Sequence, residues 1–288
     1  MKESKMQTPM GITQQPQNES GNDFSIAKKI ESKEAQQAWE RIKPYLTMVS
    51  KMDSLSGRGR EIEVRNYLEN EARKFGYETK IDKVGNLWLF SDATEGEVLL
   101  CAHMDKVGEP NKMEEKGDKI VGRLDDALGV AIIMGALEKG LRPSVLFTVE
   151  EETSGTGALY AAQRINTKEE KKPKLALILD VSAKEKHGAG PLVYTSSSGI
   201  PFPEIPLQAI DKIITENGLR VKLIPGYVND STHFARLPNQ AVATLQVHVD
   251  NMHSREEVAL VSDIKEAALV LEAIIKNHGV LPELRVNM

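Results

Sequence analysis

Short, continuously apolar segments constrain the fold of this chain more than any other feature of its sequence. Val98–Cys101 is one such segment and Leu175–Leu179 is another. Segments of this kind are typical of strands that are covered on both faces, as in parallel sheets. Helical patterns such as Ile62–Ala72 and Ser262–Asn277 alternate with the predicted strands through most of the chain. We therefore expect an α/β fold with a mostly parallel mixed sheet and helices on both faces.

The start of the chain differs in composition from the rest. Residues 1–34 are rich in Gln, Asn, Ser, Glu and Lys and poor in apolar residues, so burial cannot offset the entropy lost on ordering them. We expect a flexible polar N-terminal tail over residues 1–34 and a single folded domain over residues 35–288.

Charge and cysteine content exclude several classes of partner. The chain has 37 basic and 42 acidic residues, a net charge of -5 and no dense basic block, which argues against nucleic acid and acidic membranes as partners. Its one cysteine, Cys101, rules out an intramolecular disulfide framework and fits a reducing compartment. No segment approaches the roughly 18 apolar residues of a membrane helix, and the first residues carry no export signal pattern. We therefore expect a cytoplasmic protein.

One predicted strand leads directly into an acidic loop. The apolar segment Ser144–Val149 is followed by three consecutive carboxylates, Glu150–Glu152, and then by a glycine-rich segment that opens a helix over Ala158–Arg164. Adjacent acids repel one another unless solvent or a cation neutralises their charge. A solvent-exposed acidic loop explains this stretch taken alone, and the rest of the chain shifts the interpretation to a metal site.

Other predicted strands also end in residue types that bind metals. His103 and Asp105 follow Val98–Cys101, and their side chains point the same way because residues two apart in an extended chain share a face. In open α/β sheets, ligands bind beyond the carboxyl ends of the strands, so such residues should gather at one edge. The residues at predicted strand ends, with one Asp that opens a helix, are His103, Glu151, Glu152, Asp180, His253 and Asp125.

The size of this set indicates more than one ion. Asp125 taken alone is explained as the cap of an amphipathic helix with apolar residues from Val130 to Leu137. Two imidazoles and three or four carboxylates, however, suit two zinc ions about 3.5–4 Å apart. Asp105 is better placed to orient His103, because metal-bound histidines usually give their other N–H to an acceptor.

Five motifs, in their order along the chain, resemble those of the dinuclear zinc exopeptidases, and above all those of the tetrahedral and glutamyl aminopeptidases. The motifs are Ala102–Gly108, Asp125–Gly129, Glu151–Glu152 followed by Gly157–Ala158, Asp180–Val181 and Asn251–Ser254. Ser56–Gly57 and Asp82–Leu87 also fit the N-terminal region of this family, so the resemblance spans about Leu46 to Asn277. Five ordered motifs are a specific signal, whereas a lone His-x-Asp is weak.

The resemblance implies a zinc-exopeptidase-like catalytic domain and a role for each matching residue. The implied ligands are His103 and Asp180 for one ion, Glu152 and His253 for the other, and Asp125 as the bridge. Asp105 would orient His103, and Glu151 would be the general base that activates water. The implied activity is that of a metallo-aminopeptidase, a hydrolase that removes N-terminal residues from peptides or small amides. Cobalt or manganese would be the alternatives to two zinc ions.

The chain departs from these families in two places. The tetrahedral aminopeptidases insert a dimerisation domain between the positions of Asp105 and Asp125, but residues 106–124 have room only for a loop and one short strand near Lys119–Val121. Related carboxypeptidases and deacylases insert a lid domain after the position of Asp180, and here core elements use most of residues 181–252. We expect a bare catalytic domain, whose oligomers, if any, do not form through the usual inserted domain.

Other functions fit parts of the pattern. A di-zinc carboxypeptidase or an N-acyl-amino-acid amidohydrolase would use the same two ions, and a metal-binding relative without turnover would have no use for Glu151. Gly155–Gly157 suggests a dinucleotide-binding turn, but Tyr160 stands at the third glycine position and the upstream acids would repel pyrophosphate. Asp230 and His233 lie in a loop that either faces the substrate or is merely exposed.

Overall fold

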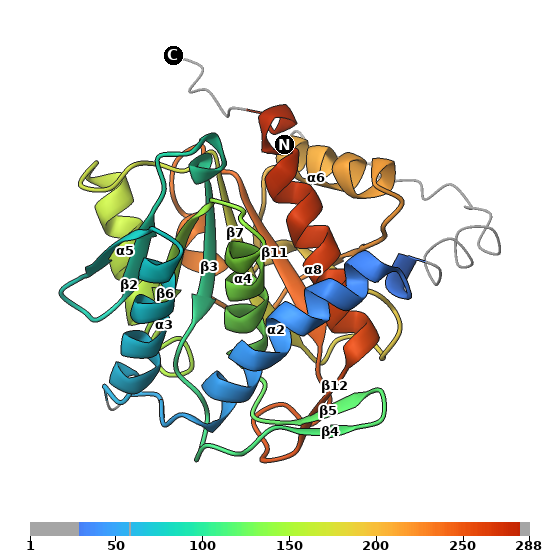
Figure 1. The fold of residues 1–288 in the computed structure, drawn as a ribbon. Helices are drawn as coiled ribbons and strands as arrows, with labels where there is room; N and C mark the ends of the chain where they lie inside the picture. The colour runs from blue at the N-terminus through green and yellow to red at the C-terminus, as the bar shows by residue number, and fades with distance from the viewer. Residues whose placement is uncertain (1–28, 58, 283–288) are drawn as a thin grey trace, which may run out of the picture.

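The computed structural model describes residues 29–57 and 59–282 (Figure 1). Positions 1–28 of the predicted tail therefore lie outside the described residues. The first long helix, α2, spans Lys33–Lys51, and the Ser32 hydroxyl caps it by accepting a hydrogen bond from Ala35 N at 3.2 Å. Because α2 begins at Lys33, the last two residues assigned to the tail are helical.

A nine-stranded mixed sheet forms the centre of the molecule, in the order β1, β2, β6, β3, β7, β11, β8 and β10, with β9 paired to β8. The strands are β1 Glu78–Ile81, β2 Leu87–Phe90, β3 Val98–His103, β6 Ser144–Thr148, β7 Leu175–Ser182, β8 Leu192–Ser197, β9 Ile200–Pro201, β10 Lys222–Pro225 and β11 Val242–His248. The central strands β6, β3, β7 and β11 are parallel to one another, and the strands on either side of them, β2 and β8, pair antiparallel with β6 and β11. At the edges, β1 pairs antiparallel with β2 and β10 pairs parallel with β8. The predicted α/β fold is confirmed, and four parallel strands form the centre of its mixed sheet.

Helices cover the sheet on both faces. Helix α4 (Ala127–Glu138) packs on β3 and β7, α8 (Val261–Lys276) packs on β11, and α2 contacts both of these helices. Figure 1 shows α2, α4 and α8 in front of the sheet and α5 (Thr156–Asn166) behind it. The remaining helical elements are α3 Ile62–Lys74, α6 Glu204–Glu216, α7 Ser231–Ala235 and the short turns η1 Thr94–Glu97 and η2 His278–Val280.

Helix α4 is more deeply buried than its predicted amphipathic pattern indicates. Every residue from Ala127 to Leu137 is buried, because the helix lies between the sheet and α2 and leaves no side to solvent. Gly135 permits this close packing, since a Cβ atom there would lie 2.8 Å from Ile42 Cγ1 of α2. Although α4 is apolar all round, no helix in the described part of the chain is both long and apolar enough to cross a membrane.

A second sheet of three strands lies beside the main one, at the lower right of Figure 1. Strands β4 (Glu114–Lys116) and β5 (Lys119–Gly122) pair as a hairpin, and β12 (Glu257–Leu260) pairs antiparallel with β5. The sequence pattern predicts only the second strand of the hairpin, because all three residues of β4 are exposed and charged. The hairpin occupies the segment between Asp105 and Asp125, so no inserted domain stands there, as expected.

Burial of α4 leads to a stability prediction. We expect Leu137→Ala to lower the free energy of unfolding by about 2–5 kcal/mol, because Leu137 is fully buried and its truncation leaves a cavity. The matched control is Leu159→Ala on α5, where the side chain is 41% exposed and the expected loss is below about 1 kcal/mol. Denaturant titration measures both, and equal losses in the two variants would contradict the packing described here.

Candidate metal centre

The five predicted metal ligands converge at the carboxyl edge of the central strands. His103 ends β3, Asp180 lies two residues before the end of β7, and Glu152 follows β6. Asp125 precedes α4, and His253 lies in the turn between β11 and β12. Segments that are far apart in the sequence therefore meet at the edge where α/β sheets bind ligands.

The Asp125 carboxylate lies between the two imidazoles. Its Oδ1 is 3.2 Å from His103 Nε2, and its Oδ2 is 3.3 Å from His253 Nε2. Asp180 Oδ1 lies 3.8 Å from His103 Nε2, whereas Glu152 Oε2 lies 3.3 Å from His253 Nε2. These distances pair Asp180 with His103 and Glu152 with His253, and Asp125 lies between the two pairs. A ligand atom of Glu152 also lies within 4.8 Å of ligand atoms of His103 and Asp125.

Asp126, rather than Asp125, caps α4. The peptide bond between the two residues is cis, and Asp126 Oδ1 accepts a hydrogen bond from Gly129 N at 2.8 Å. Helix capping therefore does not account for Asp125. A ligand atom of Asp126 also lies within 4.8 Å of ligand atoms of His103 and Asp180, so this acid is close enough to share an ion with them.

Glu257 joins two segments of the site, and the sequence reasoning missed it. Its buried carboxylate accepts hydrogen bonds from the backbone of Leu124, Asp125 and His253, at 2.5, 3.1 and 2.8 Å. The carboxylate therefore fixes the Asp125 segment against the His253 turn. In the sequence, Glu257 is marked only as the second of two adjacent acids before the apolar residues Val258–Leu260, and the strand β12 that it begins was not predicted.

Asp105 supports the site in more ways than predicted. His103 Nδ1 lies 3.0 Å from the backbone oxygen of Asp105 and 3.5 Å from its carboxylate. The two oxygens of that carboxylate accept hydrogen bonds from Glu151 N and Glu152 N, at 3.0 and 3.1 Å. Asp105 is therefore positioned to orient His103 mainly through its main chain, while its side chain holds the loop of the two glutamates.

The carboxylates of the site are short of partners. Burial raises the pKa of Glu151 to about 9 and that of Glu152 to about 8. Burial would also raise the pKa of Asp125, but the two imidazoles outweigh it and hold this pKa at about 2. Asp125 Oδ1 and Glu152 Oε1 are buried and have no hydrogen-bond partner. Carboxylate oxygens and imidazole nitrogens that face one another are the donors that divalent transition metals prefer, so these residues fit bound metal.

The pKa values of His103 and His253 are raised by the acids around them. Burial alone would lower the pKa of His103, but the surrounding aspartates hold it well above its usual range. Asp125 likewise raises the pKa of His253 to about 9. Metal ligation requires neutral imidazoles, so metal binding at this cluster must be coupled to release of protons.

The predicted ligands open onto a cavity of about 270 Å³, which Glu151 also lines. Tyr194 and Tyr227 form part of its wall, and no Arg or Lys among the described residues lines it. Gln246 lines it as well, beside Asp180 in the β11–β7 register, and is fully buried with neither amide atom hydrogen-bonded. Nothing in the sequence singles out Gln246, because one polar residue within a strand does not reveal which cavity it faces.

The segment with Asp230 and His233 was expected to be a loop that either faces the substrate or is merely exposed. It contains helix α7 and fits neither alternative. Asp230 is fully buried, and it accepts a hydrogen bond from the Thr148 hydroxyl at 2.5 Å. His233 packs against Gly155, where a Cβ atom would lie 2.6 Å from its Nε2. Neither residue lines the cavity, but the neighbouring Asn229 does, and it donates to Asp180 Oδ2 at 3.1 Å.

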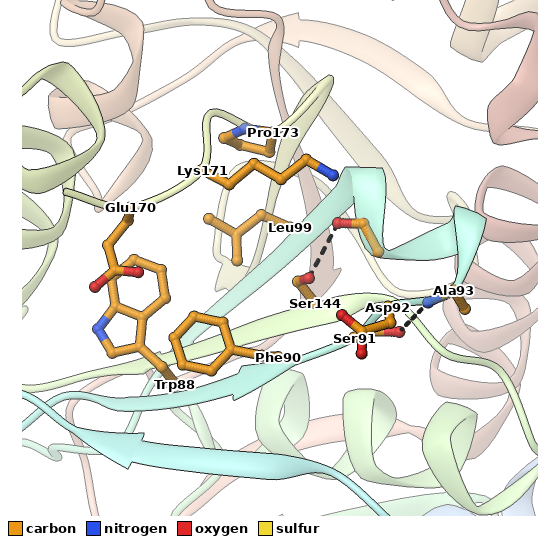
Figure 2. Close-up of a pocket in the computed structure, with 11 residues that line it drawn as sticks. Trp88, Phe90, Ser91, Asp92, Ala93, Leu99, Ser144, Glu170, Lys171 and Pro173 are labelled. Carbon is orange, nitrogen blue, oxygen red and sulfur yellow. Dashed lines mark hydrogen bonds between the residues drawn. The ribbon is translucent and has the colours of Figure 1, made fainter. Parts of the chain in front are cut away.

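Another cavity, of about 250 Å³, lies toward the opposite ends of the strands (Figure 2). Leu99 and Ser144, near the starts of β3 and β6, line it together with the stacked rings of Trp88 and Phe90. None of the predicted site residues reaches it. The cavity that the acids and imidazoles share is therefore the candidate site.

Residues 99–277 match the sequence profile of Peptidase family M20/M25/M40. The chain belongs to this family. It is therefore a peptide hydrolase, and peptidases of this family depend on bound metal. No curated protein matches the chain.

Several solved structures share the fold. TET1 peptidase of Pyrococcus horikoshii is similar over 81% of this chain and 99% of its own, at 18% identity and a TM-score of 0.68. Aminopeptidase APDkam598 of Desulfurococcus kamchatkensis is similar over 82% of this chain and 95% of its own, at 18% identity and a TM-score of 0.70. Aminopeptidase PepT of Bacillus cereus is similar over 83% and 98%, at 14% identity and a TM-score of 0.65. These structures share the fold of this chain, and together with the family match they confirm the predicted resemblance to the exopeptidases that include the tetrahedral aminopeptidases.

The contacts of Asp105 lead to a prediction about metal affinity. We expect Asp105→Asn to weaken metal binding about 10–100-fold, because an amide offers one acceptor oxygen where the carboxylate offers two and turns an NH₂ group toward a backbone N–H. Competition with a chelator measures the affinity. Asp211→Asn, at an exposed position of α6, is the matched control and should bind metal as the wild type does. Wild-type affinity in Asp105→Asn would contradict the positioning role.

Proposed function

We propose that this peptidase is an aminopeptidase that binds two divalent metal ions in the cavity bounded by the five proposed ligands. Zinc is the metal we propose first, with cobalt and manganese as the alternatives. The observation that carries the proposal is the position of Asp125, which places one carboxylate oxygen near each imidazole. His103 and Asp180 would hold one ion, Glu152 and His253 the other, and Asp125 would bridge them. When bound, the ions would supply Lewis-acid stabilisation of the charge that develops on the scissile carbonyl oxygen and would favour ionisation of water.

Glu151 is the proposed general base. It lines the cavity next to the ligand Glu152, and its backbone N–H is held by Asp105. Its side chain would take a proton from the attacking water and pass it to the leaving amine. Glu150 stays outside this assignment, because it does not line the cavity and its carboxylate accepts a hydrogen bond from Ser154 at 3.3 Å.

The charge of the cavity favours a substrate with a free amino terminus. Carboxylates line the cavity, and none of the described lysines or arginines does, so a substrate ammonium group would find partners there and a substrate carboxylate would find no cationic side chain. Lys184 is close to the cavity, because its Nζ lies 3.8 Å from the centre of the Tyr227 ring in the cavity wall. This ammonium group does not line the cavity and donates a hydrogen bond to the Pro225 carbonyl. This balance supports an aminopeptidase over a carboxypeptidase.

The test of the activity is a substrate panel run on metal-loaded protein. We expect hydrolysis of aminoacyl chromogenic amides, no hydrolysis of N-acylated amino acids or of substrates that present only a free carboxylate, and loss of activity with chelator that zinc, cobalt or manganese reverses. Cleavage of the N-acylated compounds alone would favour the amidohydrolase, and cleavage at a free carboxyl terminus the carboxypeptidase. No turnover with any substrate would identify a metal-binding relative without activity.

The role of Glu151 gives a second, sharper prediction. Glu151→Gln keeps the shape of the side chain but removes the proton acceptor, so kcat should fall by about 10²–10⁴ while the metal content stays at the wild-type value. Glu150→Gln is the matched control and should keep its activity. Retained activity in Glu151→Gln would remove this residue as the base.

Gln246 is proposed to bind the polar backbone of the substrate, because its buried amide faces the cavity without a hydrogen-bond partner. Gln246→Leu has a similar volume and cannot form that bond, so we expect kcat/KM to fall about three- to tenfold, mainly through KM, with metal content unchanged. Gln208→Leu, at an exposed position of α6, is the control. Steady-state kinetics that do not differ from those of the control would exclude a contact with substrate.

A further inference from the structure

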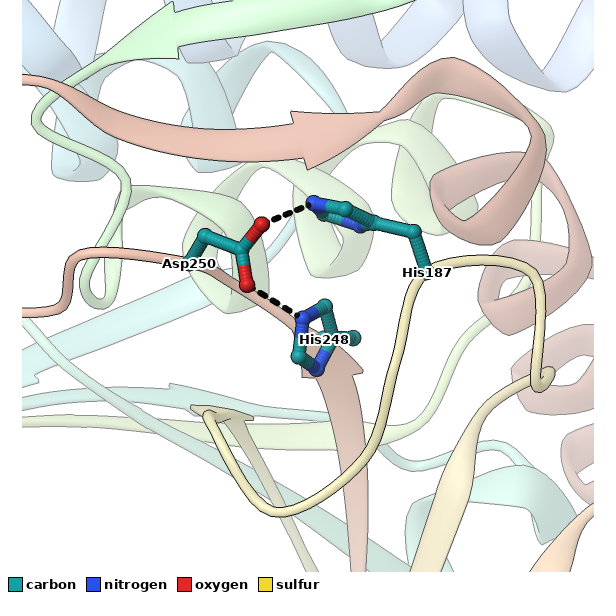
Figure 3. A group of neighbouring side chains, drawn as sticks. All are labelled: His187, His248 and Asp250. Atoms are coloured by element: carbon teal, nitrogen blue, oxygen red, sulfur yellow. Dashed lines mark hydrogen bonds and ion pairs between the residues drawn. The ribbon is translucent and has the colours of Figure 1, made fainter.

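A second group of metal-ligand side chains lies apart from the candidate active site and shares no residue with it (Figure 3). His187 comes from the loop between β7 and β8, His248 is the last residue of β11, and Asp250 follows two residues later. Asp250 Oδ2 is 2.9 Å from His187 Nε2, and Asp250 Oδ1 is 2.9 Å from His248 Nε2. One ligand atom from each residue lies within 4.8 Å of the other two.

The imidazole nitrogens of this group are not all satisfied by the protein. His248 is 3% exposed, and its Nδ1 has no hydrogen-bond partner. Neither ring nitrogen of His187 makes a hydrogen bond, although its Nε2 is close to the Asp250 carboxylate. The two rings meet edge to face, with their centroids 4.4 Å apart. Buried polar atoms without partners are rare in folded proteins, so these nitrogens call for a partner that the protein itself does not supply.

A further carboxylate stands behind one of the rings. Asp263 Oδ2 lies 3.6 Å from His187 Nδ1, and the same carboxylate accepts hydrogen bonds from Gly188 N at 3.2 and 3.1 Å. Metal-bound histidines usually have an acceptor of this kind at the nitrogen that does not bind the ion. Asp250 is exposed, so its carboxylate can shift to share an ion with both rings, and solvent can reach the remaining coordination position.

From these contacts we infer that His187, His248 and Asp250 form a binding site for a single divalent transition-metal ion, with zinc the best match to two imidazoles and one carboxylate. The site is structural. Residues 182 and 183, at the start of the His187 loop, line the candidate active-site cavity, and Val249 N donates to Ser182 O at 3.0 Å. An ion held here would fasten the His187 loop to the end of β11 and to Asp250, which lies three residues before His253.

The experiment compares metal stoichiometry in the full chain with and without the two histidines. Protein stripped with chelator, reloaded with zinc and desalted should hold one ion per chain fewer in His187→Gln/His248→Gln than in the wild type, as measured by elemental analysis. His278→Gln, which alters a histidine that bonds only to the Ile275 carbonyl, should hold as much zinc as the wild type. Because the readout is a difference of one ion, it does not depend on how many ions the candidate active site holds.

A second background separates this site from the proposed function. In His103→Gln/Asp125→Asn/His253→Gln, where the catalytic ligands are removed, about one zinc ion per chain should remain and should raise the melting temperature. If that ion is absent from the variant, this site fails while the proposed function stands. If that ion is present and the metal-loaded wild type shows no exopeptidase activity, the proposed function fails while this site stands.

Asp250→Asn covers the case in which the double histidine variant does not fold. It retains the exposed position and the hydrogen-bonding capacity of the side chain but loses the negative charge, so the affinity of this one ion should fall by more than about tenfold. An unchanged zinc content and affinity in both variants would overturn the proposal and leave the group as a hydrogen-bonded contact between a loop and a strand.

Discussion

Buried negative charge at the carboxyl edge of the sheet is the constraint on which the rest of this structure depends. Burying a carboxylate is costly unless hydrogen bonds or a cation compensate for its lost hydration. The buried acids solve this in two ways. Asp105 and Glu257 accept hydrogen bonds from backbone N–H groups with both carboxylate oxygens. Asp126 accepts one such bond, from Gly129 N, and its other oxygen is buried without a partner. Asp125 and Glu152 each keep a buried oxygen without a donor and face imidazoles instead.

The two kinds of buried acid have different roles, since some hold the backbone of the site in place and others are free to bind cations. The acids that accept backbone N–H groups hold the segments of the site in place, since Glu257 joins the Asp125 segment to the His253 turn and Asp105 supports the loop of Glu151 and Glu152. Asp125 and Glu152 lack such donors and are left to bind cations, whereas Asp180, the third proposed carboxylate ligand, also accepts hydrogen bonds from Val181 N and the Asn229 amide, at 2.7 and 3.1 Å. Hydrogen bonds of the main chain therefore hold the segments of the site in place without a metal ion, which favours a preorganised geometry of the proposed ligands.

The turn between β11 and β12 connects the candidate active site with the second histidine group. Asp250 and His253 lie on the same short segment, and that segment is held at one end by pairing of Asp250 with Val258 and at the other by Glu257. The β4–β5 hairpin stands between Asp105 and Asp125, where the tetrahedral aminopeptidases insert a domain, and β5 pairs with β12. In this chain the hairpin therefore supports the His253 turn through β12. The cavity is lined by residues of β3, β7, β8 and β11 and of the loops between the elements of this fold.

The sequence by itself determined the α/β class, the parallel centre of the sheet and the identity of the candidate ligands, because buried strands read as apolar segments and strand ends read as changes to His, Asp or Glu. Local patterns of this kind survive in the sequence since each depends on only a few neighbouring residues. Tertiary structure decided which of two adjacent aspartates caps α4, that Glu257 and Gln246 belong to the site, and that α4 is buried on every side. It also brought His187 beside His248. These outcomes depend on contacts between segments distant in the chain, and a single sequence does not encode such contacts in any local pattern.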